Sequence, residues 1–234
     1  MPQFSDDLWL GGAPGPQSQG WAGPGAVFAG VGPLGRVYIY DVVPAALSAT
    51  TVVNAQAAVA AGNVALTSTT VTLSAARALT VKSSASGDTS QGVYVTGTDY
   101  WGQVQTEYFL LNGVTGVAGK KAFKTVTQVY VGAALAGNLS VGTLDVFGLP
   151  YKVTDAGYLL RTGWAGAVAD NAGTFVAADA TTPSNTTGDV RGTFAPTGAS
   201  ASDGARRLVI AIGLTAVQAG PNATQTGAIG AVPA

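Results

Sequence analysis

The chain of 234 residues is almost neutral and carries few charged side chains. Lys and Arg number 11, Asp and Glu number 12, and charged residues make up only 10% of the chain, against about 25% in a typical soluble domain. This balance argues against a nucleic-acid-binding protein, which needs a basic patch to neutralise phosphates. Cysteine is absent from the sequence, which excludes disulfides and thiolate metal sites.

The first 35 residues are dense in glycine and proline, so no periodic helix or strand pattern survives there. Residues 1–7 also lack the basic and apolar regions of a signal peptide, and we expect none. We predict an extended N-terminal arm over residues 1–35 that becomes ordered on a neighbouring protein. Its aromatic side chains are the expected partner contacts: Phe4, Trp9, Trp21 and Phe28.

A folded body is predicted from residue 36 onward. Residues 36–43 alternate as a strand that ends before Pro44, whereas residues 45–62 are ambiguous and favour a short helix over 55–61 or none. Further short strands are expected at residues 64–66, 71–73, 78–82, 158–161, 174–177, 189–194 and 207–212.

The clearest pattern lies in residues 92–153. Val93 and Val95 alternate with polar or aromatic neighbours, residues 99–102 have turn chemistry, and a second alternating strand follows over residues 104–110. A third strand is predicted at residues 121–131. Trp101 falls at the predicted turn tip, where an exposed aromatic indicates contact with another molecule, so it is the fifth predicted partner contact.

Many short strands at spacings of about 8 to 15 residues predict an all-β fold, an antiparallel β-sandwich or a jelly-roll-like body. The body spans residues 36–212, and a division into two sub-domains near residues 83–90 or near residue 155 stays open. Residues 213–234 are again rich in Gly, Ala and Pro and are predicted to form an extended C-terminal tail.

No residue pattern predicts catalysis, a cofactor or a metal. Histidine is absent, which removes the common triads and imidazole ligands. Glu107 is the only glutamate and is expected to face solvent in the middle of a strand, and the scattered aspartates fit turn caps better than paired catalytic carboxylates. The tryptophans fit interface anchors better than sugar platforms. We therefore expect a protein that is not an enzyme.

Four segments of the chain resemble virion structural proteins of tailed bacteriophages, and most closely head cement or decoration proteins of short-tailed phages. The segments are residues 95–103, 118–127, 188–194 and 219–224. The resemblance implies a β-rich body, homo-oligomers that are often trimers, and extended termini that clasp the major capsid protein. It brings no catalytic residues with it.

The function expected from this resemblance is to bind the outside of a phage capsid and to bridge neighbouring major capsid subunits. Such a protein is made in the host cytoplasm and ends in the virion, with no membrane and no direct nucleic-acid contact. One alternative is a tail or fibre-type protein that binds host-surface glycans, which exposed aromatics clustered with Asn, Gln and Asp would support. Another is the major capsid protein or a different head structural protein, although the chain lacks a long helical pattern.

Overall fold

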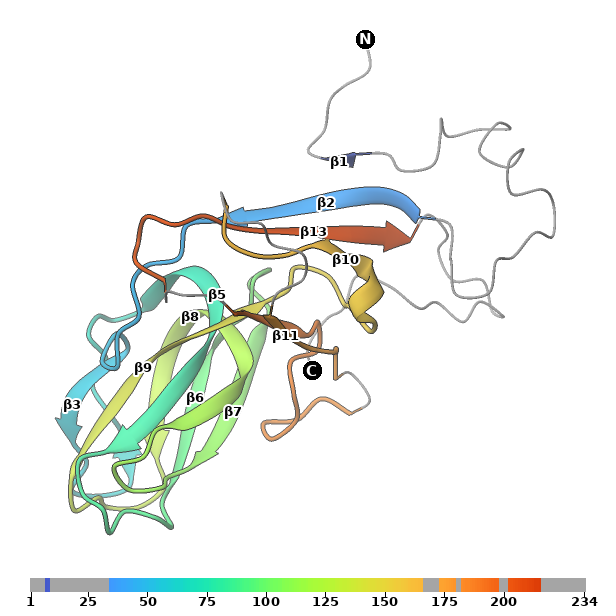
Figure 1. Cartoon of the computed structure of the whole chain (residues 1–234). Coiled ribbons are helices and arrows are strands. Elements are labelled where there is room, and N and C mark those ends of the chain that lie inside the picture. The colour runs from blue at the N-terminus through green and yellow to red at the C-terminus, as the bar shows by residue number, and fades with distance from the viewer. Residues whose placement is uncertain (1–6, 9–33, 166–172, 180–181, 198–201, 216–234) are drawn as a thin grey trace, which may run out of the picture.

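The structure, a computed structural model, describes residues 7–8, 34–165, 173–179, 182–197 and 202–215. Over these residues it consists of β-strands with one short 3₁₀ turn, η1 (Ala156–Tyr158), and all the strand pairs are antiparallel. The predicted all-β, antiparallel fold is therefore confirmed (Figure 1).

The larger of two sheets has nine strands in the order β11-β12-β9-β5-β8-β6-β7, with β3 beside β9 and β4 beside β8. Its members are β3 (Val53–Ala57), β4 (Gly62–Asn63), β5 (Val71–Ser83), β6 (Gly92–Thr98), β7 (Val104–Leu110), β8 (Val117–Val131), β9 (Asn138–Gly148), β11 (Gly173–Val176) and β12 (Thr193–Pro196). The predicted hairpin over residues 92–110 is formed by β6 and β7.

The smaller sheet has the order β1-β2-β13-β10 and pairs strands from the two ends of the chain. Its members are β1 (Asp7–Leu8), β2 (Leu34–Val42), β10 (Leu159–Arg161) and β13 (Leu208–Thr215). In Figure 1, β2 and β13 run crosswise over one end of the larger sheet. The body thus closes by joining strands that are far apart in the sequence.

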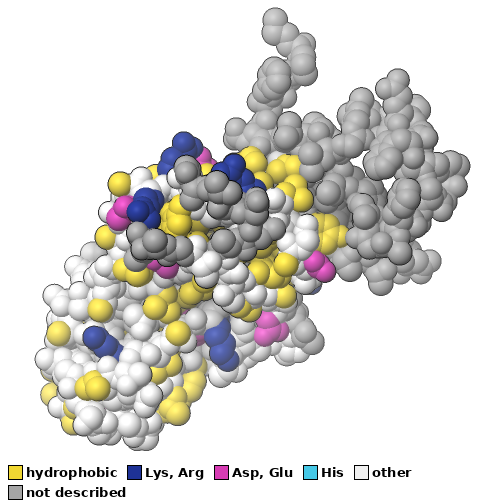
Figure 2. Space-filling model, viewed as in Figure 1, with side chains coloured by type: hydrophobic (Ala, Val, Ile, Leu, Met, Phe, Trp, Pro, Cys, Tyr) yellow, Lys and Arg dark blue, Asp and Glu magenta, His cyan; other side chains and the backbone are white. Residues whose placement is uncertain are grey.

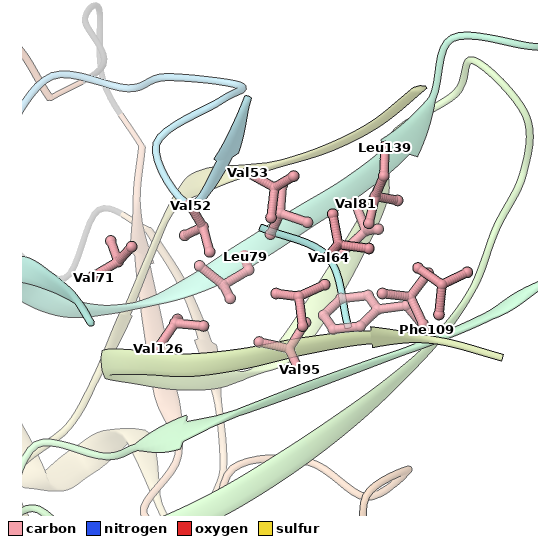
Figure 3. Close-up of a cluster of buried hydrophobic side chains, with 14 of the residues drawn as sticks. Val52, Val53, Val64, Val71, Leu79, Val81, Val95, Phe109, Val126 and Leu139 are labelled. Carbon is pink, nitrogen blue, oxygen red and sulfur yellow. The ribbon is translucent and has the colours of Figure 1, made fainter. Parts of the chain in front are cut away.

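Two hydrophobic clusters make up the core. The first gathers side chains from β3, β5, β6, β7, β8 and β9, including Val53, Leu79, Val95 and Phe109, and Figure 3 shows these side chains pointing toward one another. Because strands from distant positions in the sheet order share one cluster, the larger sheet curls around its own core. This curvature gives a single sheet the two-layered packing of a sandwich.

The second cluster joins the two sheets. It combines Tyr40, Leu208 and Ile210 of the smaller sheet with Phe147 and Phe194 of the larger one. Burial of such side chains contributes about 1.5–3 kcal/mol each, so this cluster holds the smaller sheet on the larger.

Residues 71–83 form one long strand instead of the two short strands predicted. Ala75 belongs to the second cluster and Leu79 to the first, so the middle of β5 is buried on both faces and loses the alternation that marks a strand. Between them Arg77 is 1% exposed, pairs with Asp145 at 2.6 Å and lies over the Phe147 ring.

No helix forms over residues 55–61, so the "none" alternative holds for this segment. β3 pairs with β9 across residues 53–57 instead, and the chain turns before β4. The strand predicted at residues 64–66 is wrong, because β4 contains only residues 62–63 and a single further hydrogen bond, from the Val64 amide to the Val129 carbonyl at 2.8 Å, continues toward β8. Val64 nevertheless enters the first cluster.

Charged side chains are unevenly distributed over the visible surface. In Figure 2 they gather mainly around the end that carries β2 and β13, while the opposite end of the larger sheet shows mostly uncharged side chains. Such a surface associates readily because little charge has to be desolvated.

Candidate partner-contact site

Trp101 lies in the turn between β6 and β7 and is 50% exposed, as predicted. The hairpin is closed by the Asp99 amide, which donates to the Gln103 carbonyl at 2.9 Å, and by the Gly102 amide, which donates to the Asp99 carbonyl at 3.2 Å. Gly102 has φ 82°, a left-handed conformation that glycine adopts without strain. The turn geometry therefore follows from the local sequence.

The Asp99 side chain stabilises this turn through hydrogen bonds and an ion pair. One of its carboxylate oxygens accepts hydrogen bonds from the amides of Trp101 at 2.8 Å and Gln103 at 2.9 Å. The other oxygen forms an ion pair with Arg191, and each side chain is only 4% exposed. Removing one partner of a buried ion pair lowers the free energy of unfolding by about 3–5 kcal/mol. The ion pair therefore fixes the turn to the segment that precedes β12.

The indole of Trp101 is also oriented by its neighbours. Its Nε1 donates a hydrogen bond to the Pro150 carbonyl at 2.6 Å. Its ring lies edge-on to Tyr100, with ring centroids 4.9 Å apart, and to Tyr151 at 6.3 Å. The exposed half of the indole is thus presented in one orientation, which lowers the entropic cost of binding a partner.

The contacts continue across to the smaller sheet. Tyr38 stacks edge-on against Tyr151 at 5.0 Å, Tyr40 does so against Tyr100 at 5.6 Å, and the hydroxyls of Tyr38 and Tyr100 are 3.2 Å apart. Burial raises the pKa of Tyr40, so its phenol is neutral. We refer to Tyr38, Tyr40, Tyr100, Trp101 and Tyr151 as the aromatic cluster.

Glu107 does not face solvent, in contrast to the prediction. It is 3% exposed, whereas Val104 on the opposite face of β7 is 65% exposed. One carboxylate oxygen of Glu107 accepts hydrogen bonds from the amides of Lys120 and Lys121. Burial is the main effect on Glu107 and raises its pKa to about 7.

Glu107 is buried because the first half of β8 lacks a strand partner on one of its edges. Its first half pairs with β5 along one edge, whereas β6 pairs only with residues 125–131 along the other. Buried backbone groups need partners, and side chains supply them here: besides Glu107, the Gln105 amide donates to the Ala122 carbonyl at 2.7 Å. Polar residues therefore occupy two of the three inward positions of β7, and Phe109 occupies the third.

Asp189 is a further side chain that bonds to the backbone of β8, and it also connects β8 to the Trp101 turn. Its carboxylate accepts hydrogen bonds from the Ala122 amide at 3.0 Å and from the Arg191 amide at 2.8 Å. Burial raises the pKa of Asp189 and lowers the pKa of Lys121, whose ammonium donates to the Gly188 carbonyl at 3.1 Å. Residues 188–191 are thereby held by hydrogen bonds to β8 on one side and by the Asp99–Arg191 ion pair to the Trp101 turn on the other.

Of the five predicted partner contacts, Trp101 lies where the prediction places it. Phe4, Trp9, Trp21 and Phe28 lie outside the described residues. The sequence did not predict the partly exposed tyrosines of the aromatic cluster as contacts: Tyr38, Tyr100 and Tyr151. Nothing in the local pattern shows that their strands and loops meet.

The remaining tryptophan of the described body, Trp164, is a core residue. It is 7% exposed and its ring meets Phe147 edge-on at 6.3 Å. It therefore offers no surface platform for a sugar ring. Within the described ranges, no group of three or more acidic, histidine or cysteine side chains is placed to hold a metal ion.

Comparison with known proteins gave no match to a family model, to a curated protein or to a solved structure. The function is therefore inferred from the residues and from the geometry of the described part. None of the helical structure described has the length and hydrophobicity needed to cross a membrane.

Proposed function

We propose that the protein is a non-enzymatic virion structural protein that binds the outside of a phage capsid and bridges neighbouring major capsid subunits. The observation that carries the proposal is Trp101, half exposed on a turn that Asp99, Arg191 and the Pro150 carbonyl hold in place. Tryptophan and tyrosine on a pre-oriented surface are the side chains most enriched among energetic anchors of protein interfaces.

The spatial arrangement of the phage-like segments supports the proposal. Residues 95–103 contain the Trp101 turn, residues 188–194 contain Asp189 and Arg191, and residues 118–127 contain Ala122. The Asp99–Arg191 ion pair and the hydrogen bond from the Ala122 amide to Asp189 join all three segments. Segments that are far apart in the sequence thus form one structural unit around the turn, while residues 219–224 lie outside the described residues.

The mechanism is the summation of many modest contacts. A single aromatic anchor contributes about 2 kcal/mol or more to binding, and a symmetric shell offers the same contact many times, so that linked copies gain from avidity. We propose a homo-oligomer, with a trimer favoured, at the capsid surface. The parts of the terminal segments 1–35 and 213–234 that are not paired in the smaller sheet would clasp the major capsid protein.

Co-sedimentation with empty heads of the phage that encodes the chain tests this function. We expect the wild-type protein to sediment with heads, and Trp101→Ala to weaken binding by about 30-fold, which corresponds to about 2 kcal/mol. The matched control is Val59→Ala, because Val59 is 86% exposed and lies far from the turn in sequence; it should bind like the wild type.

Two results would contradict the proposal. One is purified virions that lack this chain. The other is a Trp101→Ala variant that keeps the wild-type far-ultraviolet circular dichroism and cooperative unfolding and binds heads as tightly as the wild type.

A further inference from the structure

The outer face of β6, β7 and the end of β8 has an unusual composition. Along β6 the inward Val93 and Val95 are fully buried, which turns the residues between them outward, and β7 alternates in the same way. We define the tyrosine face by the central outward residues of these strands and by their neighbour on β4: Tyr94, Thr96, Thr106, Tyr108, Gln128, Tyr130 and Asn63. The exposed side chains of Val104 and Leu110 lie at the two ends of β7 on the same side.

Three tyrosines form a row across the strands. Tyr94 lies directly opposite Tyr108 on β7 and directly opposite Tyr130 on β8. The ring centroids are 5.0 Å and 6.3 Å from that of Tyr94, with interplanar angles of 55° and 56°. Tyr130 is 38% exposed and the other two rings are partly exposed, so the row presents aromatic surface to solvent.

A row of hydroxyl and amide groups runs beside the tyrosines. Thr96 lies opposite Thr106 and Gln128, and the two threonine hydroxyls are 3.0 Å apart. The Gln128 amide donates to the Asn63 side-chain oxygen at 2.8 Å. The oxygen of Gln128 and the amide nitrogen of Asn63 remain for a ligand, so this row offers both donors and acceptors.

No outward position of β6 or β7 carries a charge, whereas Glu107 faces inward. The segment beside β7, residues 182–188, contains no charged residue. The carbonyl of its Asn185 accepts the Tyr108 amide at 2.8 Å, and the carbonyl of its Thr186 accepts the Lys120 ammonium at 3.2 Å. Solvent-facing strands normally carry charged residues, so an uncharged aromatic face indicates a contact surface.

We propose that the tyrosine face binds a neutral carbohydrate chain. The apolar faces of sugar rings stack on aromatic rings, and sugar hydroxyls pair with amide and hydroxyl groups such as those of Gln128 and Asn63. None of the residues that define the tyrosine face is a cation that could pair with the charge of an acidic glycan. The three tyrosines would hold consecutive sugar units, with the chain lying across the strands.

The size of the face favours this ligand over a second protein. Strands of seven residues are about 23 Å long and three neighbouring strands are about 14 Å wide, so the footprint is about 300 Å². A stable protein interface covers about 800 Å² on each partner. A short stretch of a polysaccharide fits the smaller area.

The tyrosine face and the Trp101 turn are separate surfaces. Tyr94 lies four residues before the end of β6, about 13 Å along the strand from the turn. Carbohydrate binding therefore goes beyond the proposed capsid function and does not depend on it, and each can fail without the other.

Affinity electrophoresis of the purified full chain tests the proposal. The gels contain one of three neutral polysaccharides (dextran, mannan or galactomannan), neutral polysaccharide extracted from the host surface, or acidic alginate. We expect retardation in at least one neutral gel and none in alginate. Tyr130→Ala and Tyr94→Ala should weaken binding at least tenfold, and using two variants guards against one that misfolds.

The Trp101→Ala variant is the matched control, because it should lose binding to heads and keep carbohydrate binding. Tyr130→Ala should keep binding to heads and lose carbohydrate binding. Lack of retardation in every neutral gel overturns the proposal, as does retardation in alginate or unchanged retardation of Tyr130→Ala. Light scattering that shows an oligomer which Tyr130→Ala dissociates would also overturn it, because a second copy would then cover the face.

Discussion

Glu107 holds its proton more tightly than an ordinary glutamate because its carboxyl is buried beneath β8. The pKa rises from 4.5 to about 7 in the folded protein, so the folded state binds more protons than the unfolded state between these values. The stability that the neutral carboxyl contributes is present below pH 4.5 and is lost as the pH rises through about 7.

We therefore predict that the free energy of unfolding of the wild type falls between pH 5 and pH 8, by up to about 3 kcal/mol from this group. Glu107→Gln stays neutral and should flatten this decline, although the raised pKa of Asp189 leaves some slope. Urea unfolding at several pH values measures the effect. Asp203→Asn is the control, because hydrogen bonds from the amides of Ala205 and Arg206 lower the Asp203 pKa below its ordinary 3.8 and out of this window. A Glu107→Gln variant with the wild-type slope would contradict the prediction.

The pairing of β6 with β8 shows how one glycine sets the position of a strand. A Cβ atom at Gly97 would lie 2.0 Å from the Thr125 carbonyl oxygen, and the register of the two strands shifts between Thr96 and Gly97. Glycine thus allows the backbones to approach closely where the hairpin leaves β8 and leads into the Trp101 turn.

Gly97→Ala should lower the free energy of unfolding by about 3 kcal/mol, because the strands must separate. Gly87→Ala is the control: a Cβ atom there meets nothing within 4 Å, so its effect should stay within about 0.5 kcal/mol. Urea denaturation gives both values. Equal stabilities of the two variants would show that β6 can move away without cost.

The second cluster contains side chains from both sheets and joins them in the described part of the chain. Ile210 on β13 is fully buried and lies opposite Tyr40 on β2. Because this cluster is shared, we expect the two sheets to unfold together in one transition.

Ile210→Ala should therefore destabilise the entire body by about 3 kcal/mol while far-ultraviolet circular dichroism and tryptophan fluorescence still change together. Ile39→Ala on the same sheet is the control, since Ile39 is 39% exposed and should lose less than about 1 kcal/mol. Two separate transitions in the Ile210→Ala variant would mean that the sheets are independent units.

At the scale of the whole fold, local patterns predicted the all-β class, the β6–β7 hairpin and the exposed Trp101. They succeeded because alternation of side chains and turn chemistry depend on residues only a few positions apart. The same patterns split β5 into two strands, since its middle is buried on both faces by contacts with distant segments.

The sequence by itself determined where the chain extends and where it turns, because backbone preferences and side-chain alternation are local. Only the tertiary structure decided which face of each strand is buried, because a period of two residues marks two faces without saying which one meets the core. For this reason Glu107 lies inside and Tyr108 outside. The aromatic cluster and the tyrosine face likewise exist only because folding brings together residues such as Tyr38 and Tyr151, or Asn63 and Gln128, from distant parts of the chain.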